Sequence, residues 1–98
     1  MISDGAFRSR ELSGFRADRA SVNDVFREYP SAFRVAEITV REIIDAGCIV
    51  VTDEPPQGHV NIYRGDKPGD RISGSAAGRM AKRARLNPSQ NPLLAPKP

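Results

Sequence analysis

The residue best suited to acid–base chemistry in this chain is its single histidine, His59. His59, Asn61 and Tyr63 alternate along the run HVNIY, so in a β-strand their side chains would share one face. Together with Arg64, they could act on a phosphodiester, with histidine as general base, tyrosine as proton donor and arginine stabilising the phosphorane. One hypothesis is therefore a small basic ribonuclease-like toxin that uses His59, Tyr63 and Arg64. The same alternation is also typical of the solvent-facing side of a half-exposed strand.

A second group of chemically useful side chains lies in the basic C-terminal part of the chain. Residues 1–70 carry nine Lys/Arg and twelve Asp/Glu, a net charge of −3, whereas residues 71–98 carry six Lys/Arg and no acid, a net charge of +6. Such asymmetry is typical of a chain whose basic part binds an acidic protein surface or nucleic acid. Four phosphate contacts would lower the logarithm of the binding constant with a slope of about −3 to −4 against the logarithm of salt concentration. The predicted partner-binding residues are Arg79, Lys82, Arg83 and Arg85.

Several other kinds of chemistry lack the residues they need. Cys48 is the only cysteine and His59 the only histidine, so no zinc site of the usual type is expected, and Cys48 should be a small buried apolar residue. The carboxylates form no closely spaced pair and no glycine-rich phosphate-binding motif is present, which disfavours metal-dependent nuclease and nucleotide-hydrolysing sites. No set of residues at recognition-helix spacing indicates base-specific reading. We therefore expect no cofactor and no metal.

Capping signals and periodicity predict two short helices in the first half of the chain. The segments 21–29 and 39–46 each begin with Ser or Thr followed three residues later by an acid, the spacing of a capping box. An apolar stripe of helical period follows in both segments. Gly47 can adopt the left-handed conformation that ends the second helix. The buried stripe of that helix, residues 40–46, is expected to contain Val40, Ile43, Ile44 and Ala46.

Alternation and β-branched residues predict the main strands. The run CIVVT at residues 48–52 is expected to be a central strand covered on both faces, because it is apolar at nearly every position. A proline turn joins it to residues 59–63, with which it should form an antiparallel hairpin. Another strand is expected over residues 33–37, with Phe33 and Val35 facing inward.

The last predicted helix, residues 73–86, is basic and has an apolar stripe of alanines, so it is expected to attach weakly to the rest of the domain. With a short edge strand over residues 12–18, the order of elements is β-α-β-α-β-β-α. This order indicates an α+β fold with a small mixed or antiparallel sheet of three to four strands and two or three helices. Residues 12–86 should form one domain, residues 1–11 a flexible segment and residues 87–98 a disordered proline-rich tail.

These expectations combine into a leading hypothesis about function. No apolar segment is long enough to span a membrane and no targeting segment is visible, so we expect a soluble, cytoplasmic protein of bacterial type with no membrane partner. The chain would be a small non-enzymatic binding domain that engages an acidic protein surface or nucleic-acid phosphates through its basic C-terminal helix. A homodimer is an open alternative, since the small aliphatic core would gain stability from it.

Overall fold

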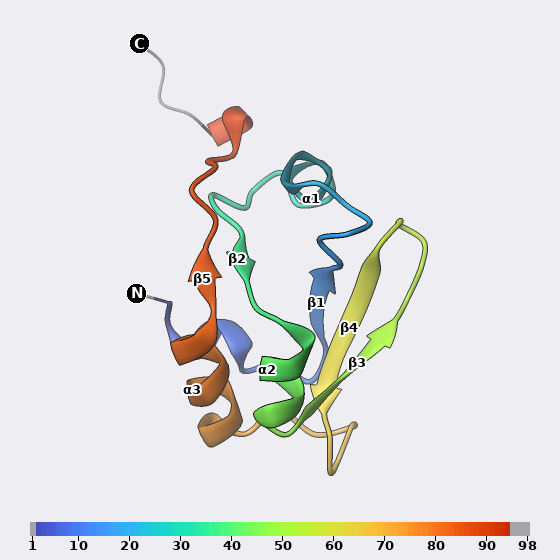
Figure 1. Ribbon diagram of the computed structural model, residues 1–98, viewed down its shortest axis with the longest axis vertical. Coiled ribbons are helices and arrows are strands. Elements are labelled where there is room, and N and C mark those ends of the chain that lie inside the picture. Colours follow the sequence, from blue (N-terminus) through green and yellow to red (C-terminus); the bar gives the residue numbers. More distant parts are fainter. Residues whose placement is uncertain (1, 95–98) are drawn as a thin grey trace.

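The computed structural model describes residues 2–94 and has the expected α+β fold, with three α-helices and two antiparallel sheets (Figure 1). The short helices η1 and η2 lie near the two ends of the described chain. The elements in chain order are η1 (Asp4–Phe7), β1 (Leu12–Phe15), α1 (Val22–Glu28), β2 (Ala36–Glu37), α2 (Val40–Asp45), β3 (Cys48–Thr52), β4 (His59–Arg64), α3 (Gly74–Arg83), β5 (Arg85–Leu86) and η2 (Pro92–Leu94).

The larger sheet has the strand order β1-β4-β3, and all its pairs are antiparallel. The predicted hairpin of β3 and β4 is confirmed, with Val50 opposite Ile62. The prediction that residues 48–52 form the central strand is wrong, because β1 pairs with the other side of β4 and leaves β3 at an edge. β3 is consequently exposed along much of its length, while β4 is buried over most of its length.

Local start and stop signals determine the bounds of α1 and α2. Both helices begin with a complete capping box, in which the Ser21 or Thr39 side chain accepts from the backbone N–H three residues later and an acid accepts from the cap's own N–H. Gly47, directly after α2, has a φ of 93°, the left-handed conformation that glycine tolerates best. The predicted buried stripe of α2 is only half right: Ile43 and Ala46 are buried, but Val40 and Ile44 are each 52 % exposed.

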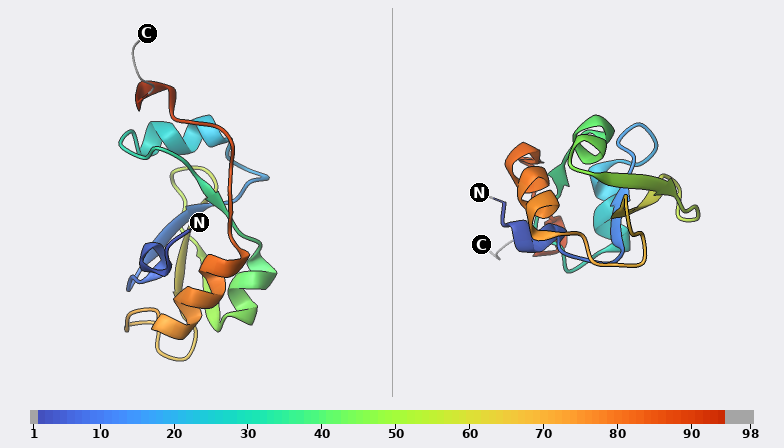
Figure 2. Two further views of the ribbon diagram at one scale, coloured as in Figure 1. Left: turned by 90° about the vertical axis from the view of Figure 1, so that its left-hand side faces the viewer. Right: turned by 90° about the horizontal axis from the view of Figure 1, so that it is seen from below.

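The core lies between the larger sheet and a layer made by η1, α2 and α3 (Figure 2). Its centre is α3, because Ala77 and Met80 have no exposed surface and Ala76 is 5 % exposed. The expectation that this helix attaches weakly is therefore wrong. Its alanines bury little area each, but they let the helix backbone come close to η1 and α2, so that Met80 is enclosed on all sides.

α3 is shorter than the predicted helix 73–86. Ala84 has an extended backbone with ψ 147°, and the next two residues form β5, which pairs with β2. β2 in turn covers only Ala36–Glu37, less than the predicted strand 33–37, and Phe33 is 52 % exposed and does not face inward as predicted. The ribbon of β2 and β5 joins the lower body of the molecule to an upper part that contains α1 (Figure 1).

Two segments outside the predicted domain 12–86 contact it. Phe7, from the segment expected to be flexible, is 7 % exposed and belongs to the core. After β5 the chain runs back beside α1, where the side-chain amide of Asn91 donates to the carbonyl oxygens of Pro30 and Ala32, each at 2.8 Å. The last four residues of the predicted tail, 95–98, lie outside the described residues. None of the helices within residues 2–94 has the length and apolar character needed to cross a membrane.

Candidate functional site

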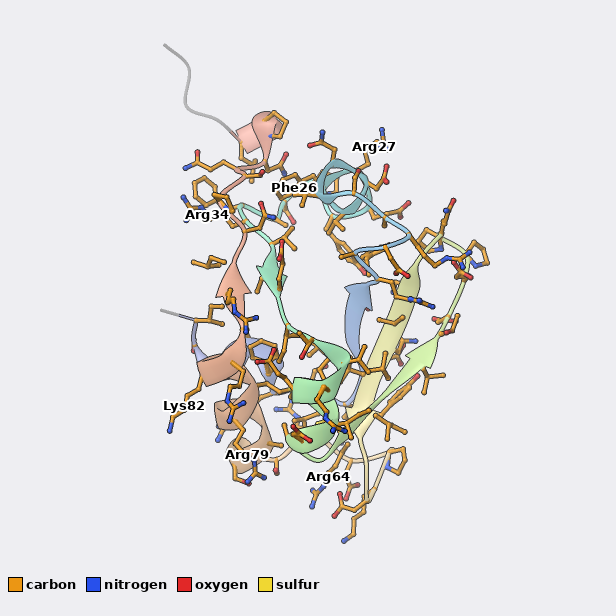
Figure 3. All side chains as sticks on the ribbon, in the orientation of Figure 1. Phe26, Arg27, Arg34, Arg64, Arg79 and Lys82 are labelled. Carbon is orange, nitrogen blue, oxygen red and sulfur yellow. The ribbon has the colours of Figure 1, made fainter. Side chains whose placement is uncertain are left out.

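The candidate site is the outer side of α3, where the predicted basic residues lie. Ser73 caps the helix by accepting a hydrogen bond from the N–H of Ala76 at 3.2 Å. Ala76, Ala77 and Met80 are the buried residues of α3, and Lys82 lies on the side opposite them. Arg79 and Arg83, three residues before and one after Lys82, flank it, and all three side chains are exposed. We call these three residues the basic face. Figure 3 shows Arg79 and Lys82 projecting outward from the helix.

The basic face has no acidic partner among the side chains that the structure describes. Arg79, Lys82 and Arg83 are all exposed at the residue level, and none of them forms an ion pair with any of these described acids. No acid lies in the first turn of α3 either. Their three charges are therefore available to a partner.

Arg85, the fourth predicted contact, lies outside α3 and has an acidic neighbour. It lies in β5, and its Nη2 is 3.3 Å from Oε2 of Glu42 at the beginning of α2. The hydrogen bond from the backbone N–H of Thr39 lowers the pKa of Glu42, and Arg85 lowers it further. Arg85 thus links β5 to α2, and the structure separates it from the basic face.

A shallow hollow of about 250 Å³ adjoins Arg79. It is lined by Ala46 and Gly47 after α2, by Ser73 and Ala76 at the beginning of α3, and by the charged residues Arg64, Asp66 and Arg79. Arg64 contacts Asp66 through two nitrogen–oxygen pairs at 2.7 and 3.3 Å, and this hydrogen bonding lowers the pKa of the Asp66 carboxyl. Arg79 is thus the cation in this hollow whose charge is not already matched by an acid.

Two further residues, Cys48 and Arg8, lie close to residues of the hollow. Cys48 is 2 % exposed, as predicted, and burial raises the pKa of its thiol, while the charges of Arg79 and Arg64 act in the opposite direction. Arg8 was not predicted as a site residue, because it lies in a segment without periodicity. A Cβ on Gly74 would collide with the guanidinium of Arg8, so this cation covers the beginning of α3. It extends the positive surface beyond the basic face.

The structure does not bring together the residues of the ribonuclease hypothesis. His59 and Arg64 lie at opposite ends of β4, about 16 Å apart along the strand, and on opposite faces of the sheet. Tyr63 shares the face of His59 but lies about 13 Å further along. In Figure 3, Arg64 lies at the lower end of the molecule, near Arg79.

His59 itself is a packed residue. It is 9 % exposed, its Nδ1 lies 2.9 Å from the carbonyl oxygen of Asp53, and its ring meets that of Phe15 edge-on at 5.3 Å. Asn61 is 4 % exposed and donates to the Asp53 carboxylate at 2.8 Å. The expectation that this side of the strand faces solvent is therefore wrong for both residues. Their contacts with Asp53 hold the turn between β3 and β4.

The chain matches no protein-family model, no curated protein and no solved structure. Among the side chains that the structure describes, no three from His, Cys, Asp or Glu lie close enough together to hold a metal ion.

The arrangement on α3 is suited to binding anions. Three cations on a helix whose alanines and methionine are enclosed in the core have a fixed position relative to the fold. Their long side chains can still adjust to the spacing of phosphates or carboxylates. None of the large apolar side chains that are exposed on this protein lies on α3. The surface therefore offers charge without an apolar centre.

Proposed function

We propose that this protein is a small non-enzymatic binding domain whose basic face engages nucleic-acid phosphates without reading base sequence. The observation that supports this most directly is the pairing state of Arg79, Lys82 and Arg83. They are exposed residues of a well-buried helix, and they form no ion pair with any acid whose side chain the structure describes. Phosphate contacts from Lys and Arg supply most of the affinity in sequence-independent binding.

The character of the surface favours phosphates over an acidic protein. Protein interfaces usually have a few large apolar or aromatic anchors at their centre, surrounded by polar residues. The outer side of α3 presents no such anchor. Binding to phosphates needs none, because the release of counterions from the nucleic acid provides the driving force.

The test compares two double variants with the same change in net charge. Arg79→Glu with Arg83→Glu reverses two charges of the basic face. Arg34→Glu with Arg41→Glu is the matched control, since both arginines are exposed and form no ion pair within the described part of the chain. In Figure 3, Arg34 lies at the upper end of the molecule, far from Arg79. Binding of labelled duplex DNA and single-stranded RNA would be followed by fluorescence anisotropy over a range of salt concentrations.

We expect the α3 variant to bind at least about tenfold more weakly and to lose about 1.8 units of salt slope on duplex DNA, while the control changes little. Thermal unfolding of both variants would confirm that they fold. Equal weakening by the two pairs would mean that net charge alone drives binding, and would contradict the proposal. Binding to poly-glutamate but not to DNA or RNA would instead identify an acidic protein partner.

A further inference from the structure

Helix α2 has an exposed side on which apolar and charged residues lie together. Val40 and Ile44, one turn apart, are each 52 % exposed. Arg41 and Asp45, also one turn apart, are exposed next to them. We call these four residues the outer side of α2. In both views of Figure 2, α2 lies at the margin of the molecule, so another molecule can reach this side of the helix.

The two charges on the outer side of α2 are not matched within the fold. Neither Arg41 nor Asp45 forms an ion pair with any side chain that the structure describes. Glu42, the other charged residue of α2, differs from them, because it accepts from the N–H of Thr39 and lies 3.3 Å from Arg85. Arg41 and Asp45 are therefore available to a surface that carries the opposite charges at the same spacing.

We propose that this protein forms a weak homodimer in which the outer sides of α2 from two copies pack antiparallel about a two-fold axis. Such an axis keeps the apolar residues of both helices on one side of the contact and the charged residues on the other. Val40 then faces Ile44 of the second copy, and Arg41 faces its Asp45. Because the arrangement is symmetric, each apolar contact and each ion pair forms twice.

The occupant is a second copy because the outer side of α2 is complementary to itself. A purely acidic partner would repel Asp45, and a purely basic partner would repel Arg41. Two parallel α2 helices would place Arg41 against Arg41 and Asp45 against Asp45. The charges therefore favour the antiparallel pair, and that pair also covers Val40 and Ile44.

The dimer is expected to be weak because α2 has only six residues. Two helices of this length bury much less surface than the about 1,600 Å² of a standard interface. We expect a dissociation constant of about 0.1–1 mM. At about 1 µM, a concentration suited to measuring nucleic-acid binding, such a dimer is dissociated. The control variant Arg34→Glu with Arg41→Glu therefore still tests the basic face alone.

The first experiment makes the same substitution at two exposed valines of the full chain. Val40→Glu places a charge on the outer side of α2, in the first turn, where an acid is compatible with a helix. Val51→Glu is the matched control. Val51 is 42 % exposed, and it follows Val50, which packs against the core, so its side chain lies on the opposite face of the sheet.

Sedimentation equilibrium of the wild type and both valine variants would be measured from about 50 µM to about 2 mM. We expect Val40→Glu to weaken the dimer at least about tenfold and Val51→Glu to leave it within about twofold of the wild type. Urea unfolding would establish that both variants fold. If Val40→Glu does not fold, the charge variants of the second experiment decide the outcome.

The second experiment changes only the charges. Arg41→Glu places Glu opposite Asp45 of the second copy, and Asp45→Arg places Arg opposite its Arg41. Each single variant should dissociate at least about threefold more readily than the wild type. The double variant Arg41→Glu with Asp45→Arg has opposite charges facing each other again and should dimerise within about twofold of the wild type.

Three results would overturn the proposal. The first is a wild-type chain that remains monomeric at about 2 mM. The second is a dimer that Val40→Glu and Val51→Glu weaken equally, because a surface other than the outer side of α2 would then hold it. The third is a double charge variant as weak as the two single variants, because Arg41 and Asp45 would then not face each other.

Discussion

Helix α2 is the more aliphatic of the two and is partly exposed, whereas helix α3 is made of small and basic residues and is the more buried. α2 lies in the most aliphatic stretch of the chain, yet Val40 and Ile44 are each 52 % exposed. α3 is rich in Ala, Gly and basic residues, yet Ala77 and Met80 have no exposed surface. Both helices are capped by a hydroxyl side chain, so capping does not account for the contrast.

The contrast shows that position in the fold decides burial more than the size of the side chains does. α2 packs on β3, an edge strand, so only one side of the helix finds apolar neighbours. α3 lies between η1 and α2 over the core, and its small residues allow close approach of the backbones. In a domain this small, a helix of small residues in the central position contributes more to the core than a bulkier helix at the edge.

The largest effect should come from truncating the most buried side chain of α3. Met80→Ala removes a side chain with no exposed surface and should lower the free energy of unfolding by about 2–5 kcal/mol. Ile44→Ala in α2 should change it by no more than about 0.5 kcal/mol, because that side chain is half-exposed. Urea unfolding of both variants at the same low protein concentration makes the comparison. A loss at Ile44 as large as that at Met80 would show that α2 is buried in solution.

A smaller effect is expected from removing the cap of each helix. Ser73→Ala and Thr39→Ala each lose one hydrogen bond from a side-chain oxygen to a backbone N–H and should each cost about 1 kcal/mol. The two losses should be similar, because a cap acts locally whatever the burial of its helix. The exchanges Ser73→Thr and Thr39→Ser keep the hydroxyl and serve as controls. If only Ser73→Ala were destabilising, α2 would not unfold together with the rest of the domain.

The smallest predicted effect is a pH dependence that involves α2 and not α3. Glu42 accepts from the Thr39 N–H and lies near Arg85, and its pKa is lowered from its usual value of 4.5. Because the pKa is lower in the folded state, the stability it contributes is fully present above about pH 4.5 and is lost as the pH falls through the folded pKa. The first turn of α3 contains no acid, so no corresponding pH dependence is expected from that helix.

The variant Glu42→Gln isolates this contribution. It should have a lower unfolding temperature than the wild type above about pH 4.5, and the two should converge as the pH falls further. Thermal unfolding at a series of pH values between about 6 and 3 follows the convergence. A constant difference across that range would mean that the charge of Glu42 does not contribute.

The elements that depend on near neighbours in sequence could be predicted. The two capping boxes, the glycine after α2 and the hairpin of β3 and β4 all rest on residues within a few positions of one another. The same holds for Arg79, Lys82 and Arg83, whose common side follows from helical spacing alone. The basic face was therefore visible in the sequence.

The features that depend on distant pairing could not be predicted. Nothing in the apolar run of β3 distinguishes a central strand from an edge strand, because the order of the sheet depends on where β1 pairs. Phe7 is a single apolar residue in a segment without hydrophobic periodicity, so nothing in the sequence indicated that it belongs to the core. Arg85 lies outside the basic face because the backbone becomes extended at Ala84. The residues after Ala84 then pair with β2, about fifty positions earlier in the chain.

The contact of Asn91 with Pro30 and Ala32 has a consequence for biosynthesis. These residues are 59 to 61 positions apart, so the stretch that contains α1 leaves the ribosome well before the amide that will hold it in place. The hairpin of β3 and β4, by contrast, can close as soon as it emerges. The middle of the chain is therefore expected to fold first, and the upper part of the molecule to assemble only after translation has passed Asn91.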